Sequence, residues 1–348
     1  MNFTEIPFFF IIGRPRSGTT LLRTLFDAHP NCIVPPEYPV ITDIFHRFGP
    51  DKTWNRDDVQ GFYNSFIQPQ LFDFWKFEYL QINEENLRTN LTQIAQGTSS
   101  VDVLKLFYLH AGSDFEKEDI RLLGDKNPVY ALYTKQLMRW FPEAKFIFIT
   151  RDYRDNFVSM RKFEFEAPNM AIQAYRWKYI SRMFHRLQKK YPGRIIHVRH
   201  EDIATHPEES LRNLCSFLSL PYNDSVLQFH KKSDAMANKT GRDVFMKYHE
   251  SLTRPVNSDN VGLWKSVLNE KEIRQADFIV GKWGKMYGYE ASGIKIKISD
   301  IPSSMLFQCY GYILYQMMLL GERLPYRLKV KLAGFLPSLA KFYRRFFQ

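Results

Sequence analysis

Cysteine is scarce in this chain, since only Cys32, Cys215 and Cys309 occur among 348 residues. The three are widely spaced and form no CxxC pair, which argues against a zinc ribbon and a disulfide framework. A chain without structural disulfides is typical of a reducing compartment. We therefore expect a cytoplasmic protein without a structural metal.

The first residues lack the features of a secretory leader. They carry no basic cluster, they include Glu5, and the apolar run at residues 8–12 is too short for a signal peptide. A glycine-containing motif starts directly after this run. We therefore expect neither a cleaved leader nor an N-terminal membrane anchor.

Acidic residues are outnumbered by basic ones, 37 to 48, and the formal net charge is +11. An excess of this sign favours an anionic partner. Residues 301–348 hold seven basic residues and one acid, so this segment alone contributes +6. The chain shows no combination of basic and aromatic residues typical of RNA-binding modules, and we expect no nucleic acid partner.

Short apolar runs alternate with segments of helical periodicity. The runs lie at residues 8–12, 146–149 and 195–198, and the helical patterns include residues 19–28, 170–191 and 207–219. This alternation predicts an α/β, P-loop-like three-layer fold with a central, mostly parallel sheet. Ligands of such folds bind beyond the carboxyl ends of the strands.

The loop between the first predicted strand and helix is the most informative motif. Its residues are Gly13, Arg14, Pro15, Arg16, Ser17, Gly18, Thr19 and Thr20. Backbone N–H groups at a helix N-terminus form an anion site, so we predict that all eight bind a phosphorylated ligand. Thr19 stands where a Walker A loop has its lysine, and Arg16 supplies a cation inside the loop. This favours a phosphosulfate bound without metal.

This loop closely resembles the 5′-phosphosulfate loop of the sulfotransferases that use 3′-phosphoadenosine 5′-phosphosulfate (PAPS). The following residues 23–30 resemble those of the tyrosylprotein sulfotransferases and their bacterial relatives. The resemblance covers roughly residues 8–290. It implies transfer of the sulfuryl group from PAPS to a hydroxyl, with adenosine 3′,5′-bisphosphate as product and no metal.

A second arginine follows the run at 146–149. Arg151 and Ser159 stand eight positions apart, and Asp155 or Asn156 is predicted to cap a helix that brings Ser159 near its first turn. In the sulfotransferases, an arginine and a serine at this spacing hold the 3′-phosphate of PAPS. The resemblance therefore implies that Arg151 and Ser159 bind the cofactor; an exposed sequence without a ligand is the alternative.

Sulfuryl transfer needs a base for the acceptor hydroxyl and donors that stabilise the leaving group. Counted without gaps from Arg16, Glu37 falls where the tyrosylprotein enzymes keep their catalytic glutamate. Lys126 matches a lysine that stabilises charge on the bridging oxygen, and Arg16 shares that task. The alternatives are an exposed carboxylate and a surface turn. The next candidates for the base are His29, His200 and Asp125.

A third segment, residues 254–265, resembles the loop that closes over PAPS. Gly262 stands closest to the place where the family often has a serine, so a side-chain contact is absent there. Trp264 is predicted to stack on the adenine ring. Packing of Trp264 in the core is the alternative.

The acceptor region departs from the tyrosylprotein enzymes. Tyr38 and Pro39 follow Glu37 where those enzymes have threonine and arginine, and their disulfide-forming cysteines have no counterparts. Residues 54–79 hold nine aromatic and two basic residues, in the region of the family's acceptor wall. This favours a lipid, a sterol-like or phenolic alcohol, or a carbohydrate over tyrosine in a secreted protein. Core packing of a helical insert is the alternative.

Residues 291–348 form a predicted C-terminal extension behind a sulfotransferase domain at residues 1–290. Residues 301–321 contain no charged side chain, but a proline and several polar residues interrupt them, so a transmembrane helix is not clearly indicated. We favour packing on the domain or on a second subunit. Peripheral contact with an anionic membrane is the alternative.

Two other functions compete with sulfuryl transfer. A metal-dependent P-loop nucleotide kinase would use a loop of the same shape, and magnesium dependence distinguishes it. A nucleotide-binding module without catalysis would be insensitive to the loss of Glu37.

Overall fold

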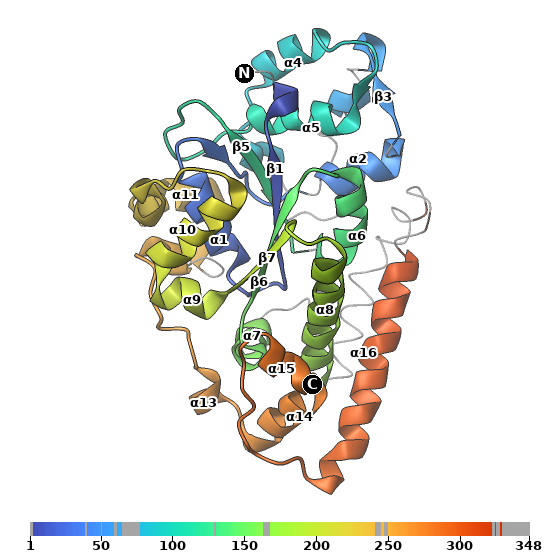
Figure 1. The fold of residues 1–348 in the computed structure, drawn as a ribbon, viewed down its shortest axis with the longest axis vertical. Helices are drawn as coiled ribbons and strands as arrows, with labels where there is room; N and C mark the ends of the chain where they lie inside the picture. Colours follow the sequence, from blue (N-terminus) through green and yellow to red (C-terminus); the bar gives the residue numbers. More distant parts are fainter. Residues whose placement is uncertain are drawn as a thin grey trace.

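Five parallel strands form the central sheet, in the order β2-β5-β1-β6-β7 (Figure 1). They are β1 (Phe8–Gly13), β2 (Cys32–Ile33), β5 (Leu122–Lys126), β6 (Lys145–Thr150) and β7 (Ile195–Arg199). The predicted parallel α/β fold is confirmed, and the three apolar runs form β1, β6 and β7. The sequence pattern does not predict β5, because its residues LLGDK end in a glycine and two charged side chains.

The computed structural model describes residues 3–38, 40–49, 51–58, 61–64, 77–128, 130–162, 168–240, 245–246 and 250–321, together with positions 324 and 328. The other helices and strands named in the text lie within these residues. A short antiparallel pair, β3 (Thr53–Trp54) and β4 (Thr98–Ser99), lies apart from the central sheet.

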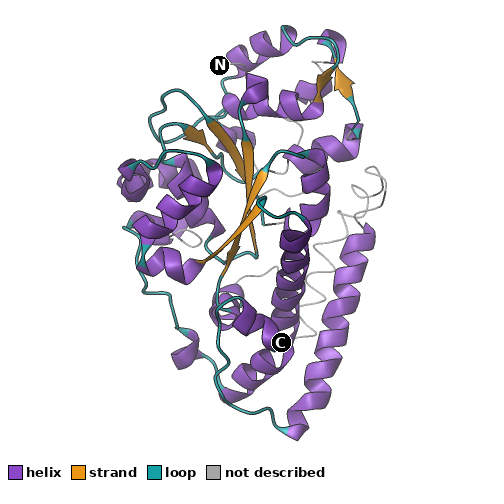
Figure 2. Ribbon diagram, in the orientation of Figure 1, coloured by secondary structure: helices purple, strands orange, loops and turns teal. Residues whose placement is uncertain are grey.

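Helices cover both faces of the sheet, which makes three layers (Figure 2). One face carries α1 (Thr19–Asp27), α9 (His200–Thr205), α10 (Pro207–Leu218) and α11 (Ser233–Thr240), and the other carries α6 (Tyr130–Trp140) and α8 (Met170–Lys190). Side chains alternate along β1. Phe9 and Ile11 enter the core beneath α1 and α10, whereas Phe8, Phe10 and Ile12 enter the core beneath α6 and α8.

The remaining helices of the described chain lie around these layers. They are α2 (Val40–Phe48), α4 (Glu84–Thr92), α5 (Ser100–Leu109), α7 (Tyr153–Met160), α13 (Trp264–Val267), α14 (Glu270–Val280), α15 (Lys282–Met286) and α16 (Ile301–Gly321). Short 3-10 segments are η1 (Phe3–Glu5), η2 (Arg56–Asp58), η3 (Phe77–Leu80), η4 (Asp224–Lys232), η5 (Glu250–Thr253) and η6 (Ile298–Asp300).

The aromatic segment at 54–79 falls partly outside the described residues, which exclude Phe66, Phe72, Phe74 and Trp75. Within the described part, Trp54, Phe62 and Tyr63 are buried in the larger core. The indole Nε1–H of Trp54 donates to Ser100 Oγ at 2.8 Å. These three side chains therefore support the fold, as the core-packing alternative expects.

The extension begins with α16, which packs along α8 (Figure 1). Gly311 makes this approach possible, because a Cβ there would stand 3.1 Å from Cδ1 of Tyr175. Further along, the ring centroids of Tyr315 and Tyr179 lie 4.2 Å apart. No helix in the described part of the chain is long and apolar enough to span a membrane.

The packing of α16 on α8 has a testable energy. Tyr315→Ala removes a buried ring and leaves a cavity against Tyr179, so we expect the free energy of unfolding to fall by about 3 kcal/mol. Leu306→Ala is the matched control, because this side chain is 66% exposed, and we expect a change below about 1 kcal/mol. Urea unfolding followed by circular dichroism measures both. Equal losses would contradict the assigned packing.

Candidate active site

The loop at residues 13–20 joins β1 to α1, as predicted. Gly18 is the N-cap of α1 with φ 87°, and no side chain within the described chain caps the helix. A Cβ at Gly18 would stand 2.5 Å from His200 Nδ1, so both the backbone angle and the space require glycine. The first N–H groups of α1 are therefore left for an anion, and the positive end of the helix dipole favours one.

Buried polar side chains support the loop from the α7 side. Asn156 Nδ2 donates to the carbonyl oxygen of Pro15 at 2.8 Å and to Ser17 Oγ at 3.2 Å. The guanidinium of Arg14 is buried and donates to Asn156 Oδ1 and Gln173 Oε1. Arg14 was grouped with the ligand-binding residues by its position in the motif. In the structure its side chain holds the loop, and its carbonyl oxygen accepts from the Ser17 N–H at 3.2 Å.

Arg151 and Ser159 both contact Arg16. The Nε–H of Arg16 donates to Ser159 Oγ at 3.0 Å, and Arg151 donates to the carbonyl oxygen of Arg16 at 3.3 Å. Arg151 Nε is buried and has no hydrogen-bond partner among the described residues. A buried donor without a partner is costly, and a phosphate oxygen would satisfy it. Arg151 and Ser159 therefore both lie beside the loop, as their predicted role as an anion anchor requires.

The helix between Arg151 and Ser159 begins differently from the prediction. Asp152 is the N-cap of α7, and its carboxylate accepts from the Arg154 N–H at 2.9 Å. Ser159 consequently lies in the last turn of α7, and the predicted caps, Asp155 and Asn156, lie inside the helix. The predicted cap was therefore wrong, because the helix begins three to four residues earlier than expected.

A second group of contacts lies at the carboxyl end of β5, where Lys126 meets Glu37 and Thr20. Lys126 ends β5, is 1% exposed, and forms an ion pair with Glu37 Oε1. Its ammonium also donates to Thr20 Oγ1 at 3.2 Å. Burial lowers the pKa of Lys126, and the neighbouring Glu37 carboxylate opposes that shift. The Glu37 side chain keeps 33% exposure, so a ligand can reach it from outside.

The segment that carries Glu37 is held by a buried ion network. Arg23 Nε donates to the carbonyl oxygens of Val34 and Pro35 at 2.9 and 3.3 Å. Asp27 accepts from the Val34 N–H at 3.2 Å and pairs with Lys117 at 3.5 Å. This network makes α1 the support for the carboxylate as well as for the phosphate loop.

The reserve candidates for the base are all engaged or buried. His29 Nε2 lies 2.7 Å from a backbone carbonyl oxygen, and burial lowers its pKa. Asp125 accepts from the hydroxyl groups of two buried tyrosines at 2.6 and 2.7 Å, and burial raises its pKa to about 6. Burial lowers the pKa of His200 to about 3, and its ring lies against Gly18. Among these four groups, Glu37 alone combines exposure with contact to Lys126.

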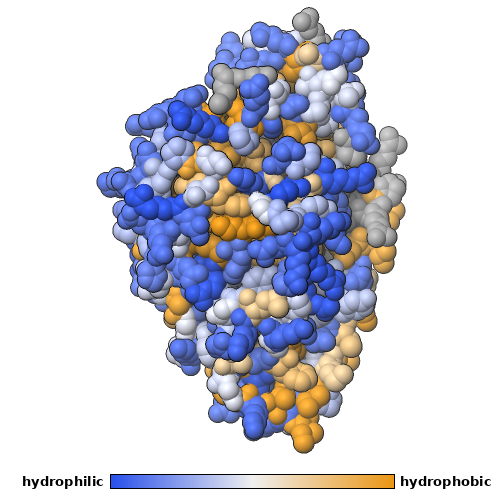
Figure 3. All heavy atoms as spheres, in the orientation of Figure 1, coloured by the Kyte–Doolittle hydropathy of each residue, from blue (hydrophilic) through white to orange (hydrophobic). Residues whose placement is uncertain are grey.

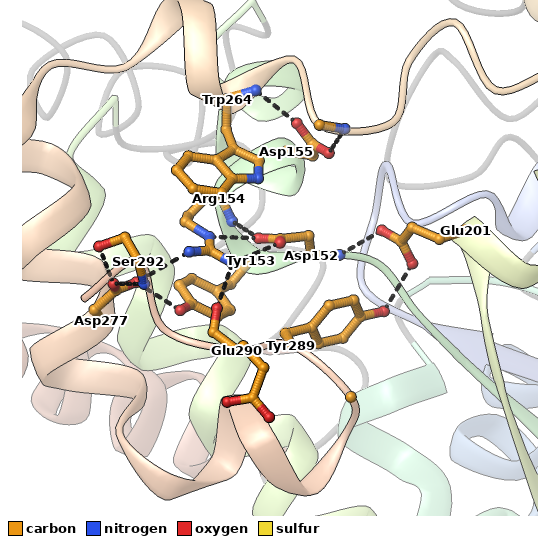
Figure 4. Close-up of polar contacts among 12 residues, drawn as sticks. Asp152, Tyr153, Arg154, Asp155, Glu201, Trp264, Asp277, Tyr289, Glu290 and Ser292 are labelled. Atoms are coloured by element: carbon orange, nitrogen blue, oxygen red, sulfur yellow. Dashed lines mark hydrogen bonds and ion pairs between the residues drawn. The ribbon is translucent and has the colours of Figure 1, made fainter. Parts of the chain in front are cut away.

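The late segment around Gly262 lies over α7 (Figure 4). Asp155 accepts from the Gly262 N–H at 2.6 Å and from the Trp264 N–H at 2.8 Å. Arg151 donates to the carbonyl oxygen of Asn260 at 2.6 Å. The segment that resembles the closing loop is therefore attached to the same helix and arginine as the anion anchor.

The ring of Trp264 lies over a guanidinium, as Figure 4 shows. The Cζ of Arg154 stands 3.8 Å from the ring centroid. Arg154 is fixed by ion pairs with Asp152 at 2.8 Å and with Asp277 at 3.5 Å. The half-buried ring of Trp264 also packs against the larger core. The face that meets Arg154 is therefore not available for stacking on a base.

The fold and the site define an α/β protein whose loop between β1 and α1 has the form of a phosphate-binding loop. The chain belongs to the sulfotransferase family, whose sequence model matches residues 7–224. The family membership expected from the loop is confirmed.

Curated relatives include protein-tyrosine sulfotransferase 1 of Danio rerio, 24% identical over 75% of this chain and 66% of that protein. The protein-tyrosine sulfotransferase of Drosophila melanogaster is 26% identical over 75% of this chain and 47% of its own length. Human protein-tyrosine sulfotransferase 1 is 26% identical over 82% of this chain and 70% of its length. The chain thus spans less than two thirds of the zebrafish and fruit-fly proteins.

Two solved structures share the fold. The sulfotransferase domain of the Synechococcus PCC 7002 olefin synthase has a TM-score of 0.56 and 20% identity, covering 82% of this chain and 95% of that domain. The sulfotransferase domain of the curacin biosynthetic pathway has a TM-score of 0.54 and 21% identity, covering 82% and 99%. At these identities the likeness establishes the architecture alone.

Sequence reasoning missed the residues that hold the site together. Asn156 and Gln173 support the loop through Arg14, and Asp155 holds the late segment. A polar side chain inside a helix gives no signal of such a contact, because its partners lie more than 100 positions away.

Asp155 is predicted to hold the segment around Gly262 and Trp264 against α7. Asp155→Asn keeps the size of the side chain but removes the carboxylate that accepts both N–H groups. We expect the Gly262 and Trp264 amides to exchange hydrogen roughly tenfold faster, as for the loss of about 1.4 kcal/mol of hydrogen bonding. Hydrogen exchange by mass spectrometry measures this. Asp259→Asn is the control, because its ion pair with Arg254 is exposed; equal effects would contradict the assignment.

Proposed function

We propose that this protein transfers the sulfuryl group of PAPS to a hydroxyl group, with Glu37 as the general base. The observation that carries the proposal is the contact of Glu37 with the buried Lys126 beside Thr20, at the N-terminus of α1. A carboxylate, an ammonium and an uncapped helix end are the three groups that such a transfer needs.

Two groups of residues are proposed to bind the two ends of the cofactor. The free Nε of Arg151 and the hydroxyl of Ser159 fit the 3′-phosphate. The α1 N-terminus fits the 5′-phosphosulfate, because its N–H groups stabilise charge on the phosphate that leaves. The proposed cofactor therefore accounts for the buried Nε–H of Arg151, which has no partner in the described part of the chain.

In the transfer itself, the acceptor oxygen forms a bond to sulfur while the bond from sulfur to the bridging oxygen breaks. Glu37 takes the proton of the acceptor hydroxyl. Lys126 donates a hydrogen bond where negative charge develops on the bridging oxygen, and Arg16 is proposed to share this task. Since Lys126 already contacts Glu37 and Thr20, it lies between the base and the loop.

For the acceptor, we propose a phenolic hydroxyl as the first class to test. The curated relatives are named for protein tyrosine, which is a phenol. Next to Glu37, the buried ring of Tyr38 packs edge-on against Phe77 with centroids 6.1 Å apart, so the surroundings of the base include aromatic side chains. Lipid, sterol-like and carbohydrate alcohols remain candidates of lower priority, since no described side chain selects for them.

Glu37→Gln tests the base. The amide keeps the shape but cannot take a proton, so we expect kcat to fall about 10²–10⁴-fold while the affinity for the cofactor stays nearly unchanged. Labelled PAPS with a panel of phenols and other alcohols supplies the assay. Glu85→Gln, at an exposed position on α4, is the matched control and should turn over normally. Near-normal turnover by Glu37→Gln would place the base elsewhere.

Arg151→Ala tests the cofactor anchor. Loss of a charge-assisted hydrogen bond should weaken binding of adenosine 3′,5′-bisphosphate by about 30-fold, equivalent to about 2 kcal/mol. Titration calorimetry measures this affinity, and a chelator should leave it unchanged because Arg16 replaces the Walker lysine. Arg121→Ala, whose side chain is 53% exposed, is the control. A strict magnesium requirement would favour the nucleotide kinase.

A further inference from the structure

An apolar stripe runs along the outer face of α16. It consists of Met305, Leu306, Tyr312, Ile313, Met317 and Leu320, which are 51–66% exposed. Leu306, Ile313, Met317 and Leu320 follow one another at spacings of seven, four and three positions, and Met305 and Tyr312 adjoin this row, so the six lie on one side of the helix. Figure 3 shows hydrophobic residues gathered at the lower right edge of the molecule, where Figure 1 places α16.

The opposite face of α16 is already occupied. Ser304, Gly311 and Tyr315 are buried, and Gly311 and Tyr315 pack against α8. Residues 301–321 contain no charged side chain, so the helix is apolar on both faces. A contiguous apolar surface of this kind marks an interaction site in a folded protein.

The sequence next to the stripe indicates what covers it. Residues 322–348 hold seven basic residues and one acid, and four of the basic residues, Arg323, Arg327, Lys329 and Lys331, follow α16 within ten positions. An apolar helix face joined to a basic segment matches a membrane surface that contains anionic lipids. A second copy would bring together two segments of +6 each, which repel.

We propose that the apolar stripe of α16 docks on an anionic lipid bilayer. The helix lies in the interface, and the net charge of +6 that residues 322–348 carry in the sequence attracts the anionic headgroups. This orientation agrees with the absence of a membrane-spanning helix from the described part of the chain. The proposal is independent of the reaction at Glu37.

Vesicle flotation of the full-length chain tests the docking. We expect binding to vesicles of phosphatidylcholine mixed with phosphatidylserine, weak binding to phosphatidylcholine alone, and release by salt because the charges are screened. Lys329→Gln with Lys331→Gln should lower the partition coefficient about fivefold per charge. Equal binding to both kinds of vesicle would overturn the anionic surface as the partner.

Paired substitutions test the stripe itself. Ile313→Glu with Met317→Glu should lower the partition coefficient at least tenfold, since each places a charge in the apolar interface. Met286→Glu, on α15 and 45% exposed, is the matched control and should bind like the unmodified chain. Ile313→Ser with Met317→Ser is the milder pair to use if circular dichroism shows that the glutamate pair does not fold.

Two outcomes would overturn the proposal. One is vesicle binding by a folded stripe variant at the level of the unmodified chain. The other is self-association in analytical ultracentrifugation that the stripe variant abolishes, combined with no binding to vesicles. The second outcome would assign the stripe to contact between copies of this chain.

Discussion

A buried ammonium group that needs partners is the constraint on which the active site depends. Lys126 is 1% exposed at the end of β5, and an ion taken out of water costs several kcal/mol unless charges and hydrogen bonds compensate. Glu37 and Thr20 supply that compensation. Thr20 belongs to α1, and Glu37 lies in the segment that follows it. The contacts of Lys126 with these two residues therefore place β5, the phosphate loop and the proposed base in one site.

A second buried cation, the guanidinium of Arg151, lies at the other end of the proposed cofactor site. Arg151 donates hydrogen bonds to the backbone carbonyl oxygens of Arg16 and Asn260, while its Nε has no partner among the described residues. Asp155 holds the late segment through two N–H groups. The late segment therefore contacts both Arg151 and α7, the helix that carries Ser159.

The parts of this site that the sequence predicted depend on neighbours in the chain. The turn after β1 requires a positive backbone angle, φ 87° at Gly18, which glycine adopts without strain. The strand and the start of the following helix can be recognised from the periodicity of neighbouring residues. Lys126 shows where prediction from neighbouring residues fails. The sequence GDKNP has the composition of a surface turn, but Lys126 is the last residue of β5, a buried strand between β2 and β1. Its prediction as a site residue came from resemblance, since periodicity carries no information on strand order.

By itself, the sequence determined the parallel α/β class, the phosphate loop and the family, because each is encoded in consecutive residues. Tertiary structure alone decided that Arg14 supports the loop, that Asp155 holds the segment around Gly262, and that Glu37 meets Lys126. It also decided that α16 packs one face on α8 and leaves the other exposed. These outcomes depend on contacts between distant segments, where burial and the pairing of charges select one partner among many that the sequence allows.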